Sequence, residues 1–481
     1  MAQAGPMDRL HMARLGAQRR DLRGGALARS LLRPGVMRTA TLLTAVGLSA
    51  LVGCSSGRGG NAGGGGSGQG GGGSVEAPVE CFEVKPGCVV PSEVTRIENP
   101  DVSAEDRGSL SRNNASFALD LGRALHSSTT NVVYAPFSIS TALAMTYAGA
   151  RTTTEQAMAA AMRFELPQER LHPAFNHVDL QLRKHAEEGG FRLHTANGIW
   201  AQIDVPLEKP FLNVLGESYG AHVRLADFVT ATKEAEGLIN AWVSHRTEGK
   251  IPKLLDEDVT PETVAVLVNA VYFHAQWKTA FVKDATQPGT FLRGDGSSVT
   301  AQMMNGRHQG SYGDGDGWEA VGIPYAGSAV SMFLVLPAKG TTDAFEESLD
   351  GAALEAIIDS TYQQPVDITM PKFSFGTSTS LKGALMDLGM EVAFGDEADF
   401  TGIVAGMKLW IHEVIHAARI DVDEAGTEAA GSTGVILNSS GSGLPAAPAA
   451  IVLDRPFFFF IRDASTQAIL FAGRVNDPTA R

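Results

Sequence analysis

The sequence predicts one large domain of the mixed α/β class over residues 105–481. Two observations lead to this prediction. Segments with apolar residues at helical spacing are interspersed with segments in which apolar residues alternate or run together, as helices and buried strands require. No internal repeat and no Gly- or Pro-rich linker divides these residues. The chain, at 481 residues, has room for one large domain or for several ordinary ones, and the lack of a linker favours one.

Residues 1–53 have the order of a signal peptide. Arg38 precedes an apolar run that is too short to span a bilayer comfortably. Cys54 follows a small residue, which resembles the lipobox of bacterial lipoproteins. We therefore expect cleavage before Cys54 and lipidation of its thiol, with an ordinary signal peptide as the alternative. Met37 would start a more compact signal, so we also consider residues 1–36 a misassigned start.

Residues 54–104 are expected to form a tether followed by a small Cys-containing segment. Residues 59–74 are nearly all Gly and Ser, a composition that cannot build a core. Cys81 and Cys88 flank a Pro-Gly pair, which is a turn signal. In an exported protein this arrangement favours a disulfide outside the main domain; a reduced pair or a metal site is the alternative.

The charge of the chain argues against a nucleic-acid partner. Its formal net charge is −14, and residues 1–53 contain eight Arg and only two acidic residues, so the remainder is more acidic still. No cluster of Lys and Arg suited to a polyanion is visible in the sequence.

Helix and strand patterns follow one another along the main domain. Residues 111–125 predict an amphipathic helix with Ser111 or Asn113 as its cap. Residues 264–273 are almost all apolar apart from Asn269, which predicts a central strand buried on both faces. Further helices are expected at residues 211–219, 239–251 and 381–389, and further strands at residues 193–200, 321–325, 330–337, 366–375, 457–462 and 468–473.

Residues 131–150 predict a short strand, a Pro turn and a helix that is apolar almost all round and therefore buried. Ser138 and Ser140 lie near the start of this helix. Buried hydroxyl groups need hydrogen-bond partners, and capping of the helix is the simplest role for both residues.

Residues 412–416 fit the H-E-x-x-H pattern of zinc metalloproteases, which requires a helix that brings both His side chains to one metal ion. The surrounding residues alternate as in a strand, which would place His412 and His416 roughly 13 Å apart, too far for one zinc ion. The pattern G-x-S-x-G occurs only at residues 53–57, beside the signal segment, and at residues 216–220, at the end of an expected helix, so neither match lies on the strand-to-helix turn of a nucleophile elbow. No Walker-type loop is present in the sequence. We therefore expect no enzymatic activity, no metal site and no cofactor.

A long uncharged stretch lies near the C-terminus. After Glu428 no charged residue occurs until Asp454. If the stretch were a strand, one of its faces would carry only small and neutral side chains before Val435. Such a segment could be a loop in one state and a buried strand in another; a flexible linker is the alternative.

Residues 424–431 closely resemble the hinge of the reactive-centre loop in serpins, the serine protease inhibitors that insert this loop into their own β-sheet. Residues 131–150 and 453–457 resemble the shutter helix and the C-terminal signature of that family. The resemblance covers residues 105–481. It implies a multi-sheet fold with a large central, mainly antiparallel sheet, surrounding helices and an exposed reactive-centre loop at about residues 424–450.

The resemblance also implies roles for particular residues. The family usually has Ser before the Pro of the shutter helix, and here that residue is Ala135. Trp277 corresponds to the breach, where the sheet begins to open. The shutter residues are Ser138, Ser140, Asn269 and His416, and the hinge residues are Glu424, Gly426, Thr427, Glu428, Ala429, Ala430 and Gly431.

The resemblance implies suicide inhibition of serine-type proteases by cleavage and insertion of the loop, with cysteine-type proteases as a further class of target. The family's spacing puts the scissile bond between Ser440 and Gly441, with Leu437 and Asn438 as the alternative. A small residue at this bond would suit an elastase-like or subtilisin-like target. A non-inhibitory binding protein or chaperone is the second reading, and a structural surface lipoprotein the third.

We expect the target protease to be the partner, the protein to be a monomer, and the lipid anchor to be its only link to a membrane. The signal and Cys54 predict export and anchoring to the cell envelope, or an extracellular location. Ser55 after the lipidated Cys indicates sorting to an outer membrane, where one exists.

Overall fold

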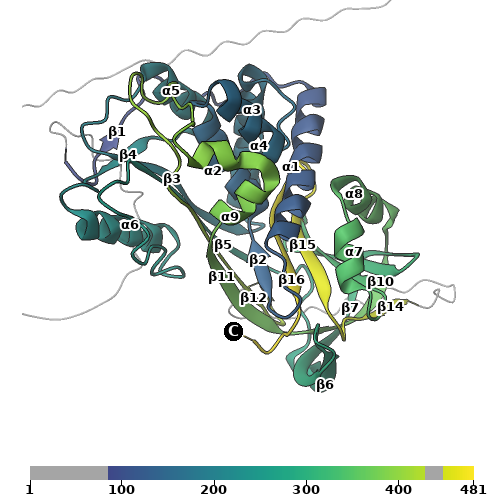
Figure 1. Ribbon diagram of the computed structural model, residues 1–481. Helices are drawn as coiled ribbons and strands as arrows, with labels where there is room; N and C mark the ends of the chain where they lie inside the picture. The colour runs from purple at the N-terminus through teal and green to yellow at the C-terminus, as the bar shows by residue number, and fades with distance from the viewer. Residues whose placement is uncertain (1–84, 428–447, 481) are drawn as a thin grey trace, which may run out of the picture. The chain divides into compact units, whose positions relative to one another are not determined.

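The computed structural model describes residues 85–427 and 448–480, all of which belong to one unit, Val75–Arg481 (Figure 1). Its first sheet has seven strands in the order β1-β4-β3-β5-β13-β12-β11. The central β5 is antiparallel to β3 and parallel to β12. The bounds are β1 Val89–Val90, β3 Arg192–Gln202, β4 Val223–Ala226, β5 Ala265–Gln276, β11 Phe373–Ser380, β12 Val414–Val422 and β13 Gly426–Thr427.

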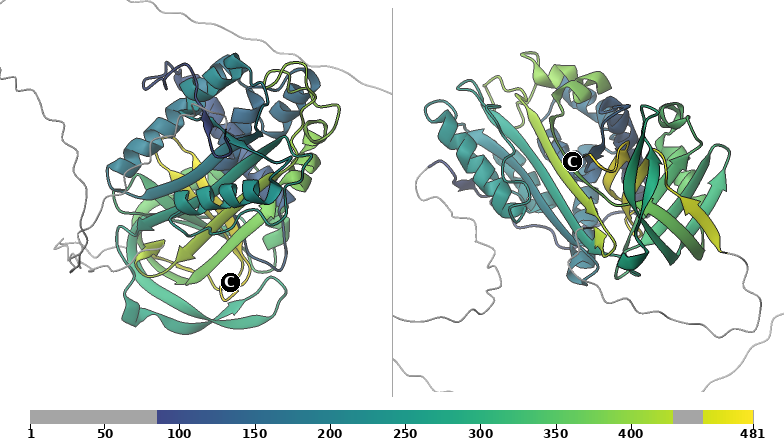
Figure 2. Two further views of the ribbon diagram at one scale, coloured as in Figure 1. Left: turned by 90° about the vertical axis from the view of Figure 1, so that its left-hand side faces the viewer. Right: turned by 90° about the horizontal axis from the view of Figure 1, so that it is seen from below.

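The central strand β5 is buried on both faces, as its continuous apolar run predicts. Leu267 and Val271 belong to the main core, whereas Val266 and Val268 belong to a second, smaller core. The second core lies under α6 (Thr232–Arg246), which covers one face of the sheet (Figure 2). The opposite face packs against α2 (Pro136–Tyr147), beside α1 (Ala104–Ala124) and α4 (Gln168–Glu187).

The second sheet has the order β14-β10-β7-β8-β9-β15-β16-β2, with β6 paired to β7. Only β10 and β14 are parallel among its named pairs. Both sheets together confirm the mixed α/β, multi-sheet prediction. The bounds are β2 Val132–Tyr134, β6 Gln287–Leu292, β7 Ser298–Gly315, β8 Trp318–Pro324, β9 Val330–Pro337, β10 Tyr362–Pro371, β14 Ala449–Val452, β15 Phe457–Asp463 and β16 Ile469–Val475.

The remaining helices surround the two sheets. In the described part of the chain no helix is long and apolar enough to cross a membrane. The bounds are α1 Ala104–Ala124, α3 Thr152–Ala161, α4 Gln168–Glu187, α5 Lys209–Val214, α7 Thr342–Ser348, α8 Gly351–Ser360 and α9 Lys382–Leu385, with shorter π- or 3-10 turns at Leu215–Tyr219, Lys283–Ala285, Met386–Met390 and Glu391–Phe394.

The start of the fold differs from the sequence prediction. Helix α1 is capped by Ser103, whose hydroxyl accepts a hydrogen bond from the backbone N–H of Asp106, so the predicted caps Ser111 and Asn113 are wrong and lie inside the helix. Cys88 is disulfide-bonded and packs against the main core, and β1 pairs with β4. The segment before residue 105 therefore contributes to the first sheet, because β1 extends its edge.

Candidate functional site: the hinge and shutter of the first sheet

A buried hydrogen-bond network joins α2 to three neighbouring strands. The side-chain amide of Asn269 (β5) donates to Ser138 Oγ (α2) at 2.8 Å and to Asn197 Oδ1 (β3) at 2.7 Å. The Asn269 side-chain oxygen bonds to Nδ1 of His416 (β12), whose Nε2 accepts the backbone N–H of Ala135 at 3.3 Å. Ser138, Asn269 and His416 thus lie together, where the sheet holds β5 and β12 side by side.

The imidazole of His416 is neutral in this network. Burial lowers its pKa to about 3, against a smaller opposing effect from Asn269. Nε2 accepts a hydrogen bond from Ala135, so the single proton resides on Nδ1 and is donated to Asn269. The backbone N–H of Ala135 therefore supplies one hydrogen bond of the network. This bond does not require the Ser side chain that the family usually has at this position.

The hydrogen-bond network differs from the predicted shutter at two residues, Ser140 and Asn197. The hydroxyl of Ser140 donates to Asn114 of α1 at 2.7 Å and does not join the Asn269 network. Asn197, which the sequence analysis missed, accepts hydrogen bonds from both Ser138 and Asn269. A single Asn in a strand pattern gave no signal for this role, since its partners come from distant segments.

The hinge begins inside the sheet. The two residues of β13 pair with β5 as Gly426 opposite Gln276 and Thr427 opposite Ala275. On the other side Thr427 is opposite Val422 of β12. A Cβ atom at position 426 would lie 2.1 Å from the carbonyl oxygen of Ala275, so only Gly fits between the strands at this point.

An aromatic pair supports the inserted hinge. The hydroxyl oxygens of Thr427 and Tyr325 are 2.6 Å apart, and both residues are almost completely buried. The ring of Tyr325 stacks on Trp277, with 4.5 Å between the centroids. The indole Nε1–H of Trp277 donates to the carbonyl of Asp423 at 2.9 Å. Trp277, the predicted breach residue, therefore holds the turn before the hinge.

Glu424 anchors the turn that leads into β13. Its carboxylate accepts hydrogen bonds from Lys372 Nζ at 2.8 Å and from Thr286 Oγ1 at 2.7 Å. Burial raises the pKa of this carboxyl, but the bonds to Lys372 and Thr286 outweigh that effect and the net pKa is lowered. The carbonyl of Glu424 also accepts the backbone N–H of Phe281 at 2.8 Å.

The two strands that flank the hinge separate at this end of the sheet. Their parallel pairing runs from Leu267 opposite Val414 to Tyr272 opposite Arg419 and then stops. Beyond that pair β13 lies between β5 and β12. The geometry provides a place for further residues of the same segment to pair with both strands.

The remaining predicted site residues lie outside the described residues. They are the hinge residues Glu428, Ala429, Ala430 and Gly431, the scissile-bond candidates Ser440, Gly441, Leu437 and Asn438, the lipidation site Cys54, and Cys81, the proposed disulfide partner of Cys88. The chain is described again at β14, which pairs with β10 in the second sheet.

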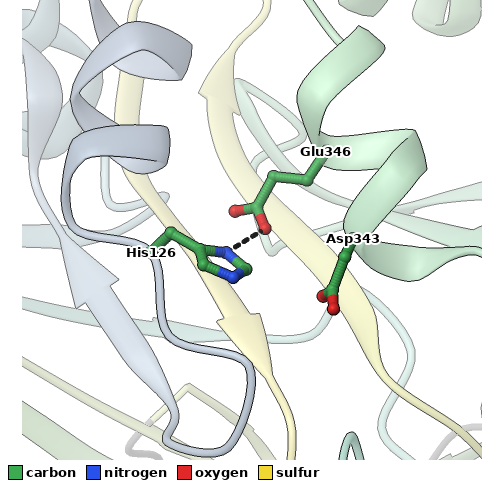
Figure 3. A group of neighbouring side chains, drawn as sticks. All are labelled: His126, Asp343 and Glu346. Atoms are coloured by element: carbon green, nitrogen blue, oxygen red, sulfur yellow. Dashed lines mark hydrogen bonds and ion pairs between the residues drawn. The ribbon is translucent and has the colours of Figure 1, made fainter.

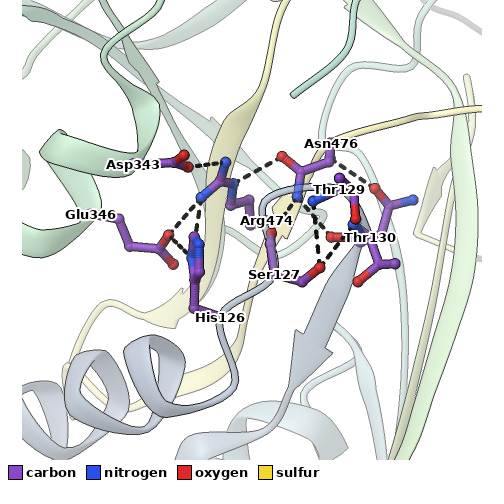
Figure 4. Close-up of polar contacts among 9 residues, drawn as sticks. His126, Ser127, Thr129, Thr130, Asp343, Glu346, Arg474 and Asn476 are labelled. Carbon is purple, nitrogen blue, oxygen red and sulfur yellow. Dashed lines mark hydrogen bonds and ion pairs between the residues drawn. The ribbon is translucent and has the colours of Figure 1, made fainter. Parts of the chain in front are cut away.

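The H-E-x-x-H segment does not form the helix that the metalloprotease pattern requires. His416 lies within β12, whereas His412 lies before it, so the strand prediction is confirmed for residues 414–422. Among the described residues, one group has the composition of a metal site: His126, Asp343 and Glu346 (Figure 3). The guanidinium of Arg474 bonds to both carboxylates at 2.6 Å and so neutralises the group with a protein cation (Figure 4). A divalent cation would have to displace this buried arginine.

Known proteins are similar to this chain over most of its length. The family model described as Serpin (serine protease inhibitor) matches residues 112–478. An uncharacterized serpin-like protein of Thermococcus kodakarensis is 35% identical over 363 residues, which cover 76% of this chain and 84% of that protein. Leukocyte elastase inhibitor of Sus scrofa is 34% identical over 386 residues, which cover 77% of this chain and 99% of the inhibitor.

Solved structures agree with these matches. The native state of the thermophilic serpin Tengpin aligns with a TM-score of 0.71 at 29% identity, covering 81% of this chain and 97% of Tengpin. Thyroxine-binding globulin in complex with thyroxine aligns with a TM-score of 0.68 at 27% identity, covering 77% and 99%. The chain belongs to the serpin family. Family membership and the similarity to elastase inhibitors support protease inhibition as its general activity.

Proposed function

We propose that this serpin inhibits serine-type proteases by offering residues 428–447 as a substrate and then inserting the cleaved segment between β5 and β12. The observation that carries the proposal is the position of Gly426 and Thr427, which already pair with β5 as the start of a new antiparallel strand. Small side chains at Ala429 and Gly431 would follow Thr427 on the core-facing side of the sheet.

The protease carries out the covalent steps up to the cleavage of the loop. Its catalytic serine attacks the scissile carbonyl, the peptide bond breaks, and the loop's N-terminal part remains attached to the enzyme as an acyl ester. The part beyond the scissile bond leaves as a free amine. Insertion then competes with attack of water on the ester, so the outcome depends on how fast the sheet accepts the hinge.

The register of β13 indicates how far the new strand can reach. Thr427 is opposite Ala275, and each further residue of an antiparallel strand meets the preceding residue of β5. The first residue of β5, Ala265, would then be opposite Leu437. Both candidate scissile bonds, Leu437 to Asn438 and Ser440 to Gly441, lie at or just after this position, so either would release a strand long enough to span β5.

Incubation of the protein with each of a panel of proteases, followed by electrophoresis on denaturing gels, tests this proposal. The panel includes elastase-like, subtilisin-like, trypsin-like and papain-like proteases. Inhibition predicts a covalent complex that survives SDS with at least one serine protease, and none with the same enzyme after its catalytic serine is replaced by alanine. Complete cleavage without a complex across the panel would contradict it. Mass spectrometry of the released C-terminal fragment identifies the scissile bond.

A binding role without inhibition is the second candidate, and the structural similarity to thyroxine-binding globulin favours considering it. The two candidates differ in the behaviour of the cut protein. A serpin that inserts its loop becomes more stable to heat after cleavage, because new strand pairs form; a protein whose loop is only a linker does not.

We also propose that the protein is exported and attached to the cell envelope through a lipid on Cys54. The signal-like order of residues 1–53 and the Gly/Ser-rich segment after Cys54 support this. Replacement of Cys54 by Ser should abolish incorporation of labelled palmitate and release the protein from the membrane fraction. Unchanged membrane association of that variant would refute the anchor.

A further inference from the structure

A half-buried arginine, Arg224, lies against two tryptophan rings beneath α6. It belongs to β4 and pairs directly with Trp200 of β3, so both side chains point to the face of the first sheet that α6 covers. The guanidinium carbon of Arg224 is 5.8 Å from the centre of the Trp200 ring and 5.1 Å from the centre of the Trp242 ring, which α6 supplies. The elements β3, β4 and α6 are labelled in Figure 1.

The two rings hold the guanidinium in one place. A Cβ atom at position 198 would lie 2.8 Å from the ring of Trp242, so Gly198 leaves the room that this ring needs on β3. The rings of Trp200 and Trp242 meet edge to face, with 5.9 Å between their centres. Arg224 is therefore fixed by cation–π contacts on two sides, unlike a surface side chain that moves freely in water.

A second cation approaches Arg224 from the helix. Arg246 follows Trp242 by four residues in α6, so these two side chains are neighbours on one face of the helix. Burial lowers the pKa of Arg224, and the positive charge of Arg246 lowers it further. Because a guanidinium stays protonated at neutral pH, two like charges lie close together at this point.

In the described ranges 85–427 and 448–480, neither Arg224 nor Arg246 has an ion-pair or hydrogen-bond partner. The buried Arg462 and Arg474, in contrast, each bind a carboxylate at 2.6 Å. A charge that is partly withdrawn from water without a counter-charge costs free energy. The described groups of the protein therefore leave this pair of cations uncompensated.

Two buried polar atoms near Arg224 also lack partners among the described residues. The first is the indole Nε1 of Trp200, a side chain that is only 2% exposed. The second is Nδ1 of His222, which lies two residues before Arg224 and so on the same face of the sheet. Burial and the charge of Arg224 lower the pKa of His222, so this imidazole is neutral and can donate one hydrogen bond. Buried donors are normally satisfied, so the group that is missing here is an acceptor.

We propose that Arg224 and Arg246 bind a tetrahedral oxyanion of the phosphate type, with Trp200 and His222 as the neighbouring hydrogen-bond donors. Two guanidinium groups match the two charges of inorganic phosphate or of a phosphate monoester, and their planar donor forks suit its oxygens. A carboxylate carries one charge and would leave one of the cations uncompensated. The anion would join the end of α6 to β4. The site is separate from the hinge and the shutter, so it does not depend on loop insertion.

Isothermal titration calorimetry of the full-length protein with inorganic phosphate, in a buffer without other multivalent anions, tests this assignment. We expect one phosphate bound per chain. Arg224→Gln should weaken the affinity at least about tenfold, because it removes a charge-assisted hydrogen bond from a half-buried position. Arg246→Gln should weaken it about two- to fivefold, because this side chain is exposed.

Arg112→Gln is the matched control, because it removes the same charge from an exposed position of α1. It should leave the affinity for phosphate unchanged. Equal weakening by Arg112→Gln and by the two site variants would show a general effect of net charge and would overturn the assignment. Replacement of the exposed Arg246 keeps the test decisive if Arg224→Gln does not fold.

Thermal unfolding provides the second measurement. Phosphate should raise the thermal midpoint of the wild-type protein and of Arg112→Gln, because a ligand that binds only the folded state stabilises it. At the same phosphate concentration the rise should be smaller in Arg246→Gln and smallest in Arg224→Gln. An equal rise in all four proteins would refute the site.

Two sources supply such a group, the free anion and an organic phosphate ester, and a parallel titration with glycerol 3-phosphate distinguishes them. Tighter binding of the ester identifies an organic phosphate, and tighter binding of inorganic phosphate identifies the free anion. Either result supports the site only if Arg224→Gln and Arg246→Gln weaken it. A wild-type protein that binds neither compound would overturn the inference and leave the proposed inhibition of proteases untouched.

Discussion

Thr427 and Tyr325 share a hydrogen bond of 2.6 Å inside the core, although they are distant in the sequence: Thr427 lies in β13 of the first sheet, and Tyr325 directly follows β8 of the second. The contact exists because β13 has entered the first sheet by two residues and turned the side chain of Thr427 inward. Tyr325 in turn stacks on Trp277, which bonds to the turn before the hinge. The start of the proposed insertion is thus already formed and supported from both sides.

Replacement of Thr427 by Arg should convert the inhibitor into a substrate. The side chain at this position is 1% exposed, and burying an unpaired guanidinium there costs several kcal/mol. We expect at least about tenfold more inhibitor to be cleaved per enzyme molecule trapped, since each 1.4 kcal/mol on the barrier to insertion slows it tenfold. Titration of a sensitive protease with the variant measures this ratio.

Thr427→Val is the matched control, because it keeps the shape of the side chain and removes only the hydroxyl. It should remain an inhibitor and lose about 1 kcal/mol of stability from the bond to Tyr325. Persistent stable complexes with Thr427→Arg at the wild-type ratio would refute the role of the hinge.

The shutter should behave as one unit under mutation. Asn269→Ala removes a side chain that serves Ser138, Asn197 and His416 at once, and leaves buried polar atoms without partners. We expect a loss of about 2–3 kcal/mol in the free energy of unfolding, measured with denaturant. Ser138→Ala combined with Asn269→Ala should cost less than the sum of the two.

Ser140 supplies the control for this cycle. It lies on the same helix two residues from Ser138, but its hydroxyl bonds to Asn114 instead of Asn269. The effects of Ser140→Ala and Asn269→Ala should therefore add. An additive result for Ser138 or a strongly coupled result for Ser140 would contradict the network described above.

The sequence was sufficient to find the parts of the shutter that carry a local pattern or a family motif. Asn269 interrupts an apolar strand, and His416 stands at a fixed distance from Glu424, so both could be predicted and both meet in the structure. Asn197 has no such pattern, and its role arises only because β3 pairs with β5 in one register. Register depends on the whole sheet and is not encoded near Asn197.

The predicted start of the first helix was wrong for a different reason. Ser103 is followed three residues later by Asp106, a signal for a helix start that lies upstream of the predicted caps Ser111 and Asn113. The partial entry of the hinge into the sheet could not be predicted at all. It depends on contacts of Thr427 and Trp277 with Tyr325, which tertiary packing brings together.

Acid should destabilise the folded protein through His416. Burial lowers the pKa of His416 from 6.5 to about 3, so the unfolded chain binds a proton more readily than the folded protein between these values. The contribution is fully present above pH 6.5 and is lost as the pH falls towards 3. At pH 4.5 we expect a loss of about 2–3 kcal/mol from this group.

Denaturant unfolding between pH 4 and pH 8 measures this loss. Buried His172 and His308, whose pKa values burial lowers to about 4, add to the slope in the same direction. His416→Gln should reduce the dependence of stability on pH, whereas His412→Gln, outside β12 and less buried, should not. A slope that is unchanged in His416→Gln would show that the imidazole is already charged in the folded protein.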